Sequence, residues 1–362
     1  MKPLFYAEVP DGLVFASELK ALLLHPQVPH EIDATGIAEL LLMGPGRTPG
    51  CGVFRTVREL KPAQCGWYQD GSISIECYWS LQAKPHTETF PQTAEHVRYL
   101  VKDAITRQLV SDVPIGTFLS GGLDSSIISS VASRVMQEKG LPLHTFSVDY
   151  KDNARYFQKS HFQPTSDPDY IRRMAEYLDC VHHWTVLDTP ALTKALYAAV
   201  DARDLPGMVD VDSSLLLFCG AIKQQVTVAL SGECADELFG GYPWYRDPDI
   251  RMTDGFPWAQ STAYRMSFLR EEFAQQIDGA AYVYQAYRTT ADHAPKLPDD
   301  SPLEARMREM MKLNLDWFMQ TLLDRKDRMY AYQAQGGRRG IPPSLYHGRY
   351  VIHRRAFYPA SA

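Results

Sequence analysis

The chain has 362 residues, of which 45% are hydrophobic, and a formal net charge of −6 at pH 7. This length allows about two domains, and the hydrophobic fraction is enough for a buried core, which excludes a disordered chain. The negative charge argues against a nucleic-acid-binding protein that relies on a general basic surface. No apolar run approaches the roughly 20 residues that span a bilayer, and the Met-Lys-Pro start is no signal peptide. We therefore expect a cytoplasmic protein without a nucleic-acid or membrane partner.

In chain order, residues 1–80 are predicted to be rich in strands and turns, with strands at 5–9 and 13–16, and a polar linker follows at 81–92. Residues 93–330 alternate short apolar runs with helical patterns, which predicts an α/β domain with a doubly wound parallel sheet. The candidate strands of that sheet are residues 115–119, 143–148, 182–187 and 227–230.

The most informative stretch is 114–126, which reads Pro-Ile-Gly-Thr-Phe-Leu-Ser-Gly-Gly-Leu-Asp-Ser-Ser. An apolar run leads into a Gly-Gly turn, and a helical pattern follows over 127–136. Free backbone N–H groups and the helix dipole make such a turn a site for phosphate. Asp124 would repel a bare phosphate, which indicates a magnesium ion between the two. The alternative, a Ser/Gly-rich turn with Asp124 as a helix cap, leaves the combination of glycines, serines and acid unexplained. The Walker and dinucleotide-binding patterns are both absent.

A second apolar run, at 226–230, ends in a Ser-Gly turn followed by Glu233, Asp236 and Glu237. Carboxylates this close repel one another unless cations or solvent separate them. The alternative is a solvated acidic start of a helix. Because both turns follow predicted strands, at the ends where open α/β sheets bind ligands, a ligand site is favoured.

The first turn resembles the pyrophosphate loop of the N-type ATP pyrophosphatases. The two turns together resemble asparagine synthetase, whose synthetase domain carries Ser-Gly-Gly-x-Asp-Ser-Ser and Ser-Gly-Glu-x-x-Asp-Glu-x-x-x-Gly-Tyr. The match is complete at the polar positions, and the resemblance covers about 93–329. It implies a fold of the adenine nucleotide α-hydrolase-like, PP-loop type. It also implies ATP-dependent amidation of aspartate to asparagine through a β-aspartyl-AMP intermediate, with ATP and Mg²⁺ as cofactors and aspartate and ammonia as substrates.

The resemblance assigns roles to individual residues. The pyrophosphate would be held by Ser120, Gly121, Gly122, Asp124, Ser125 and Ser126. The adenosine part of ATP would contact Leu119, Val148, Ser231 and Gly232. Asp124 and Asp236 would ligate magnesium. Glu233 would assist formation of the β-aspartyl-AMP intermediate, and Asp124 is counted with it as catalytic.

The two ends of the chain depart from the family pattern. Residues 1–80 resemble the last part of a glutaminase domain whose nucleophile is an N-terminal Cys, whereas Lys2 follows Met1 here. We expect a strand-rich fragment of that N-terminal nucleophile domain, and an enzyme that uses ammonia rather than glutamine. None of the six cysteines fills the role of the missing nucleophile. Cys51, Cys65 and Cys77 show no CxxC spacing, which disfavours zinc, and we expect buried, reduced thiols. Residues 331–362 are predicted to be a disordered basic tail or an out-of-frame translation product.

Other functions stay open: a ligase that activates another carboxylate, as β-lactam synthetase does, a non-catalytic remnant, and an ATP-binding module joined to a separate glutaminase subunit. A homodimer is also left open. Residues 210–215, where the family places part of its substrate pocket, lack an arginine that would bind a carboxylate. The charged residues at 324–328 would supply positive charge, but we interpret them as an exposed helix end.

Histidine and aromatic pairs give weaker signals. His182 and His183 are neighbours on a predicted strand, so they point to opposite faces and cannot share a metal. We interpret them as structural. Trp244 and Tyr245 are compatible with a substrate pocket or with an aromatic core, and the core is favoured.

Overall fold

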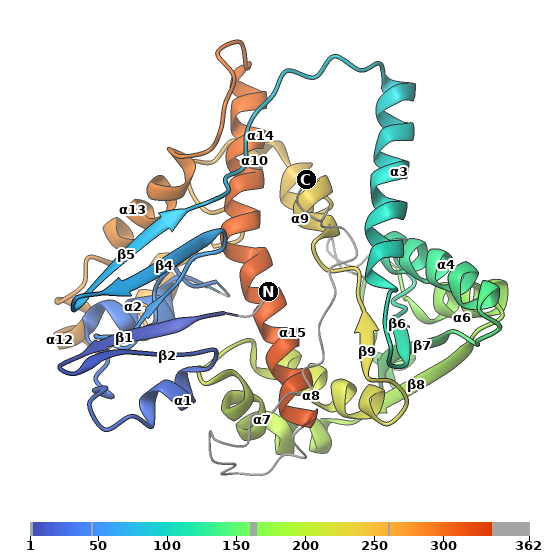
Figure 1. Cartoon of the computed structure of the whole chain (residues 1–362), viewed down its shortest axis with the longest axis horizontal. Helices are drawn as coiled ribbons and strands as arrows, with labels where there is room; N and C mark the ends of the chain where they lie inside the picture. The colour runs from blue at the N-terminus through green and yellow to red at the C-terminus, as the bar shows by residue number, and fades with distance from the viewer. Residues whose placement is uncertain (1–2, 45, 160–164, 260, 335–362) are drawn as a thin grey trace. The chain divides into compact units, whose positions relative to one another are not determined.

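The computed structural model describes residues 3–44, 46–159, 165–259 and 261–334 (Figure 1). The chain divides into two compact units. The first unit comprises Met1–Pro85 and Gly240–Asp324, and the second comprises His86–Phe239 and Arg325–Ala362. The tail predicted at 331–362 lies outside the described residues, except that 331–334 continue a helix.

The first unit begins with an antiparallel sheet. Strand β1 (Phe5–Val9) pairs with β2 (Gly12–Ala16) on one side and with β3 (Arg58–Glu59) on the other. The strands predicted at 5–9 and 13–16 are therefore confirmed. A separate hairpin is formed by β4 (Gln64–Gln69) and β5 (Ser72–Cys77).

The rest of the first unit is helical around an aromatic core. Trp317 is buried there and donates its indole N–H to the hydroxyl of Thr290 at 2.9 Å. The helices are α1 (Leu19–Leu23), α2 (Ala34–Leu42), α10 (Pro248–Arg251), α11 (Thr262–Met266), α12 (Glu271–Ala274), α13 (Gly279–Ala291) and α14 (Pro302–Leu313), with a 3-10 turn at Pro243–Tyr245 and a π-helical turn at Asn314–Phe318.

The second unit is built on a parallel sheet in the order β8-β7-β6-β9 (Figure 1). Its strands are β6 (Ile115–Phe118), β7 (His144–Tyr150), β8 (Val181–Leu187) and β9 (Val228–Leu230), each within two residues of its predicted bounds. Its helices are α3 (Phe90–Gln108), α4 (Leu123–Glu138), α5 (Asn153–Tyr156), α6 (Pro168–Leu178), α7 (Thr189–Arg203), α8 (Val209–Lys223) and α9 (Ala235–Phe239), and it also contains the end of α15 (Met319–Ala334).

Helices cover both faces of this sheet, as β9 makes clear. Val228 and Leu230 are buried in a core with α3 and α4, whereas Ala229 is buried in a core with α7, α8 and α15. Because successive strand residues point to opposite faces, these two cores lie on opposite sides of the sheet. The predicted doubly wound α/β fold is confirmed.

The strand order reverses beside β6. The chain moves outward from β6 to β7 and β8 and then returns to place β9 on the other side of β6. In open α/β sheets ligands bind outside the carboxyl ends of the strands at such a reversal. The residues that follow β6 and β9 therefore occupy the position in which a ligand is expected.

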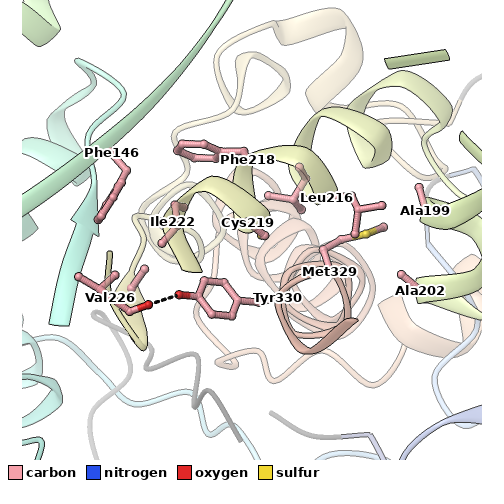
Figure 2. Packing of buried hydrophobic residues seen from close by; sticks show 12 residues of the cluster. Phe146, Ala199, Ala202, Leu216, Phe218, Cys219, Ile222, Val226, Met329 and Tyr330 are labelled. Carbon is pink, nitrogen blue, oxygen red and sulfur yellow. Dashed lines mark hydrogen bonds between the residues drawn. The ribbon is translucent and has the colours of Figure 1, made fainter. Parts of the chain in front are cut away.

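Figure 2 shows the core that fixes the end of α15 in the second unit. Met329 and Tyr330 pack among side chains of α7 and α8. Tyr330 also donates its hydroxyl hydrogen to the carbonyl of Val226, just before β9, at 3.1 Å. These contacts set the rotation of α15 and so decide which of its charged residues turn toward the sheet.

Candidate active site

The loop after β6 is fixed to the neighbouring strand and then turns sharply into α4. The N–H of Leu119 donates to the carbonyl of Phe146 on β7 at 2.8 Å, and the hydroxyl of Ser147 donates to the carbonyl of Leu119. Val148, predicted to contact adenosine, follows Ser147 on the same strand and is half-buried.

Serine hydroxyls and glycines shape the turn itself. The hydroxyl of the buried Ser125 accepts the N–H of Ser120 at 3.1 Å and donates to the carbonyl of Gly122 at 3.2 Å. Gly121 has φ +80°, and a Cβ there would lie 3.0 Å from Cβ of Tyr170. Gly122 is the N-cap of α4 and has no side chain to accept from the first turn. An N-terminus of this kind, in a 16-residue helix, suits an anion.

The loop after β9 touches the loop after β6. A Cβ on Gly232 would lie 2.9 Å from Cβ of Asp124 and 3.3 Å from the nitrogen of Ser125, so only glycine allows this approach. Ser231, which precedes it, is buried. The two stretches that the sequence singled out, 112 residues apart as counted from Ser120 to Gly232, thus meet at the reversal in strand order.

Asp124 and Asp236 interact across this contact. Burial raises the pKa of Asp124 to about 6, and the charge of Asp236 contributes to the rise. Such a pair disfavours two negative charges unless a cation lies between them.

The donor set fits magnesium bound together with a nucleotide. Among the described residues, no group of three or more His, Cys, Asp or Glu side chains is arranged to hold a metal ion. Mg²⁺ commonly takes one or two carboxylates and completes its octahedron with water and substrate phosphate oxygens. Asp124 and Asp236 would supply the protein's share, beside the loop that suits the phosphates.

Glu233 is held by cations from α15. Its Oε1 lies 2.9 Å from Nζ of Lys326 and 3.5 Å from a guanidinium nitrogen of Arg325. Its Oε2 is buried and has no hydrogen-bond partner among the residues that the structure describes. The ammonium of Lys326 also lies 4.7 Å from the ring centroid of Phe118, the last residue of β6. One lysine therefore contacts residues at the ends of both β6 and β9.

The ion pairs continue to the start of α8. Asp212 is buried, accepts from Arg203 at 3.0 Å and from the N–H of Met208 at 2.8 Å, and lies 3.9 Å from Nε of Arg325. Residues 210–215 do lack an arginine, but Arg203 and Arg325 bring their charge to Asp212 from α7 and α15. Arg203 was not predicted from the sequence, because its partner lies beyond a turn that places α7 against α8.

The interpretation of 324–328 as an exposed helix end is wrong. Arg325 is 7% exposed and Arg328 is 3% exposed, and Arg328 pairs with Asp204 at 2.7 Å. The physical reason is that the apolar residues of α15 pack into the core of the second unit and carry their charged neighbours inside with them. A usable signal was present, since Lys326 lies between Leu322 and Tyr330 at helical spacing on the buried face.

The structure also places the aromatic pair and the histidine pair that the sequence singled out. Trp244 and Tyr245 are buried in an aromatic cluster of the first unit, which agrees with the core interpretation. His182 bonds to the hydroxyl of Thr145 at 2.7 Å, whereas His183 bonds to His144 at 2.9 Å, so the two histidines have different partners. Within the part of the chain that the structure describes, no helix has the length and apolar character needed to cross a membrane.

Comparisons with known proteins agree with this geometry. The family model described as asparagine synthase matches residues 96–338, and that of a glutamine amidotransferase domain matches 1–79. The chain is 44% identical over 330 residues to asparagine synthetase [glutamine-hydrolyzing] 3 of Bacillus subtilis, with 91% of this chain and 53% of the relative covered. It is 33% identical over 249 residues to asparagine synthetase [glutamine-hydrolyzing] 1 of the same species, with 68% and 37% covered.

The chain thus spans about half the length, or less, of these curated relatives. Among solved structures, NAD⁺ synthetase from Burkholderia pseudomallei aligns at a TM-score of 0.30 and 15% identity, over 61% of this chain and 91% of that chain.

Proposed function

We propose, since the chain belongs to the asparagine synthase family, that it catalyses the ATP-dependent amidation of aspartate to asparagine through a β-aspartyl-AMP intermediate. The observation that carries the proposal is the contact between the two loops at the ends of β6 and β9. Gly232 lies against Asp124 there, which supports a site in which the Gly-Gly turn would bind phosphate beside the pair Asp124 and Asp236 and beside Glu233.

The first step would be attack of the β-carboxylate oxygen of aspartate on the α-phosphorus of ATP. An oxygen–phosphorus bond forms, the bond to the β-phosphate's bridging oxygen breaks, and pyrophosphate leaves with that electron pair. In the second step ammonia attacks the acyl carbon, AMP leaves and the nitrogen loses a proton. The enzyme's contribution is to position the reactants and stabilise charge, without a covalent enzyme intermediate.

Different residues of the chain would bind the pyrophosphate, the adenosine and the magnesium ion. Ser120, Gly121, Gly122, Ser125 and Ser126 hold the pyrophosphate through backbone N–H groups and hydroxyls. Leu119, Val148, Ser231 and Gly232 contact the adenosine. Asp124 and Asp236 hold magnesium, which when bound would neutralise the charge that builds on the leaving pyrophosphate. Glu233 assists formation of the acyl-adenylate.

The nitrogen donor in this proposal is ammonia. The assay supplies it as ammonium, so the outcome does not depend on glutamine hydrolysis or on a glutaminase partner. The assembly of the chain, as a homodimer or with a separate glutaminase subunit, stays a prediction.

The test is release of pyrophosphate from Mg-ATP with aspartate and ammonium. We expect release that requires aspartate and falls by at least about 100-fold in Asp124→Ala, because the loss of a metal ligand removes stabilisation of the transition state. Asp103→Asn is the matched control, since it removes a surface acid paired with Arg107 on α3 and should leave the rate unchanged.

Two results would contradict the proposal in different ways. Release that ignores aspartate but requires another carboxylic acid would favour a ligase for a different acceptor. A folded chain that binds Mg-ATP and releases no pyrophosphate with any acceptor would favour a nucleotide-binding remnant.

A further inference from the structure

Lys326 is a largely buried cation that contacts residues next to both loops of the candidate site. Its side chain is 11% exposed, its ammonium lies 2.9 Å from Oε1 of Glu233, and it covers the ring of Phe118 at 4.7 Å from the centroid. Phe118 ends β6, and Glu233 follows β9. The lysine therefore joins the ends of the two strands between which the strand order reverses.

Stability alone is a weak explanation for this arrangement. Taking an ammonium and a carboxylate out of water costs several kcal/mol each, and well-packed apolar side chains often replace such a pair without loss. The position of Lys326 within the buried face of α15, between Leu322 and Tyr330, would suit an apolar residue. A charge at this place thus calls for a role in the site.

The two carboxylate oxygens of Glu233 have different surroundings. Lys326 and Arg325 both approach Oε1, whereas Oε2 is buried and accepts no hydrogen bond from the described part of the chain. Buried polar atoms are nearly always hydrogen-bonded, so Oε2 is an acceptor that a donor group of a ligand can satisfy. Lys326 makes the shorter of the two contacts to Oε1, 2.9 Å against 3.5 Å, so its loss would leave the carboxylate free to rotate and exchange its two oxygens.

We propose that Lys326 is a positioning residue for the ligation reaction, which fixes Oε1 of Glu233 and keeps Oε2 as the acceptor for a proton-bearing group of the bound reactants. This role rests on the proposed function of the site. Lys326 acts through Glu233, so its removal should lower the rate of the reaction more than it lowers the affinity for nucleotide.

The experiment compares Lys326→Met, Lys326→Arg, Glu233→Gln and the double variant Lys326→Met/Glu233→Gln. The methionine keeps an unbranched apolar stem and removes the charge, whereas the arginine keeps the charge. Lys312→Met is the matched control, because it breaks the i,i+4 pair of Lys312 with Asp316 in the first unit. The measurements are kcat and KM for Mg-ATP in pyrophosphate release, and Tm.

We expect Lys326→Met to lower kcat about 100-fold, the size of effect associated with a misplaced catalytic group, while KM for Mg-ATP changes less than about threefold. Lys326→Arg should recover kcat to within about tenfold of the parent. The double variant should be no slower than Glu233→Gln alone, because residues that act as a unit are non-additive. Lys312→Met should leave both constants unchanged.

An unchanged kcat in Lys326→Met would overturn the proposal, as would a loss confined to KM or a double variant whose losses multiply. If Lys326→Met does not fold, Lys326→Gln is measured in its place against the same outcomes. A parent chain that releases no pyrophosphate overturns the proposed function, and this role with it. An active parent with an equally active Lys326→Met overturns the role alone.

Discussion

Gly121 takes a backbone conformation that residues with a side chain adopt only under strain. Its φ is +80°, and a Cβ would meet Tyr170 at 3.0 Å and the carbonyl of Asp167 at 3.1 Å. The residue is thus glycine for two reasons, the turn into α4 and the close approach of the first turn of α6 with its N-cap. Both reasons concern the loop that we propose holds pyrophosphate.

Gly140 allows the cost of the left-handed conformation to be separated from the cost of close packing. It has φ +66°, and no atom of the described residues lies within 4 Å of its Cβ position. We expect Gly140→Ala to lower the free energy of unfolding by about 1 kcal/mol, the cost of the left-handed conformation alone. Gly121→Ala should cost about 1–3 kcal/mol more, because overpacking adds to that strain. Chemical unfolding of both variants, together with Mg-ATP titration, measures the difference.

Nucleotide affinity should fall only in Gly121→Ala. Equal unfolding free energies for the two variants, with unchanged Mg-ATP binding, would mean that the packing around Gly121 has no part in the loop's function.

The pair of strands β7 and β8 carries a histidine that is kept neutral. Burial lowers the pKa of His182 from 6.5 to about 4, and the neighbouring His183 contributes. Between these values the unfolded chain binds more protons at His182 than the folded chain does. Stability from this group is therefore fully present above about pH 6.5 and is lost as the pH falls toward 4.

We predict that Tm declines as the pH is lowered through this window and that His182→Gln flattens the decline. Glutamine keeps a polar group near Thr145 and does not titrate. A slope that is the same in parent and His182→Gln would assign the decline to other groups.

Local sequence pattern predicts the strands of the second unit well, but it does not predict which charged residues are buried. Apolar runs bounded by Gly-Gly and Ser-Gly turns locate β6 and β9, because a buried parallel strand needs such a run. The burial of Arg325 and Arg328 was missed, because runs of charge on a helix are usually solvated. Only the packing of Met329 and Tyr330 in the sheet's core reveals it.

The organisation of the chain as a whole depends on contacts that local pattern does not encode. Gly240–Asp324 belongs to the same compact unit as Met1–Pro85, although more than 150 residues separate them in the sequence. Within that unit Tyr282 donates its hydroxyl to Glu39 at 2.5 Å, a bond between residues 243 positions apart. The candidate site was more predictable, since each of its loops is a short motif and only their contact is long-range.

The reaction proposed for the whole molecule begins when a carboxylate oxygen of aspartate attacks the α-phosphorus of ATP. The most direct test is the reaction of aspartate labelled with ¹⁸O in its β-carboxylate, with Mg-ATP and ammonium, followed by mass spectrometry of the AMP. We predict that each AMP formed carries one ¹⁸O from aspartate and that asparagine appears in equal amount. AMP that takes its oxygen from water instead would contradict the account, because the chain would then hydrolyse ATP without activating a carboxylate.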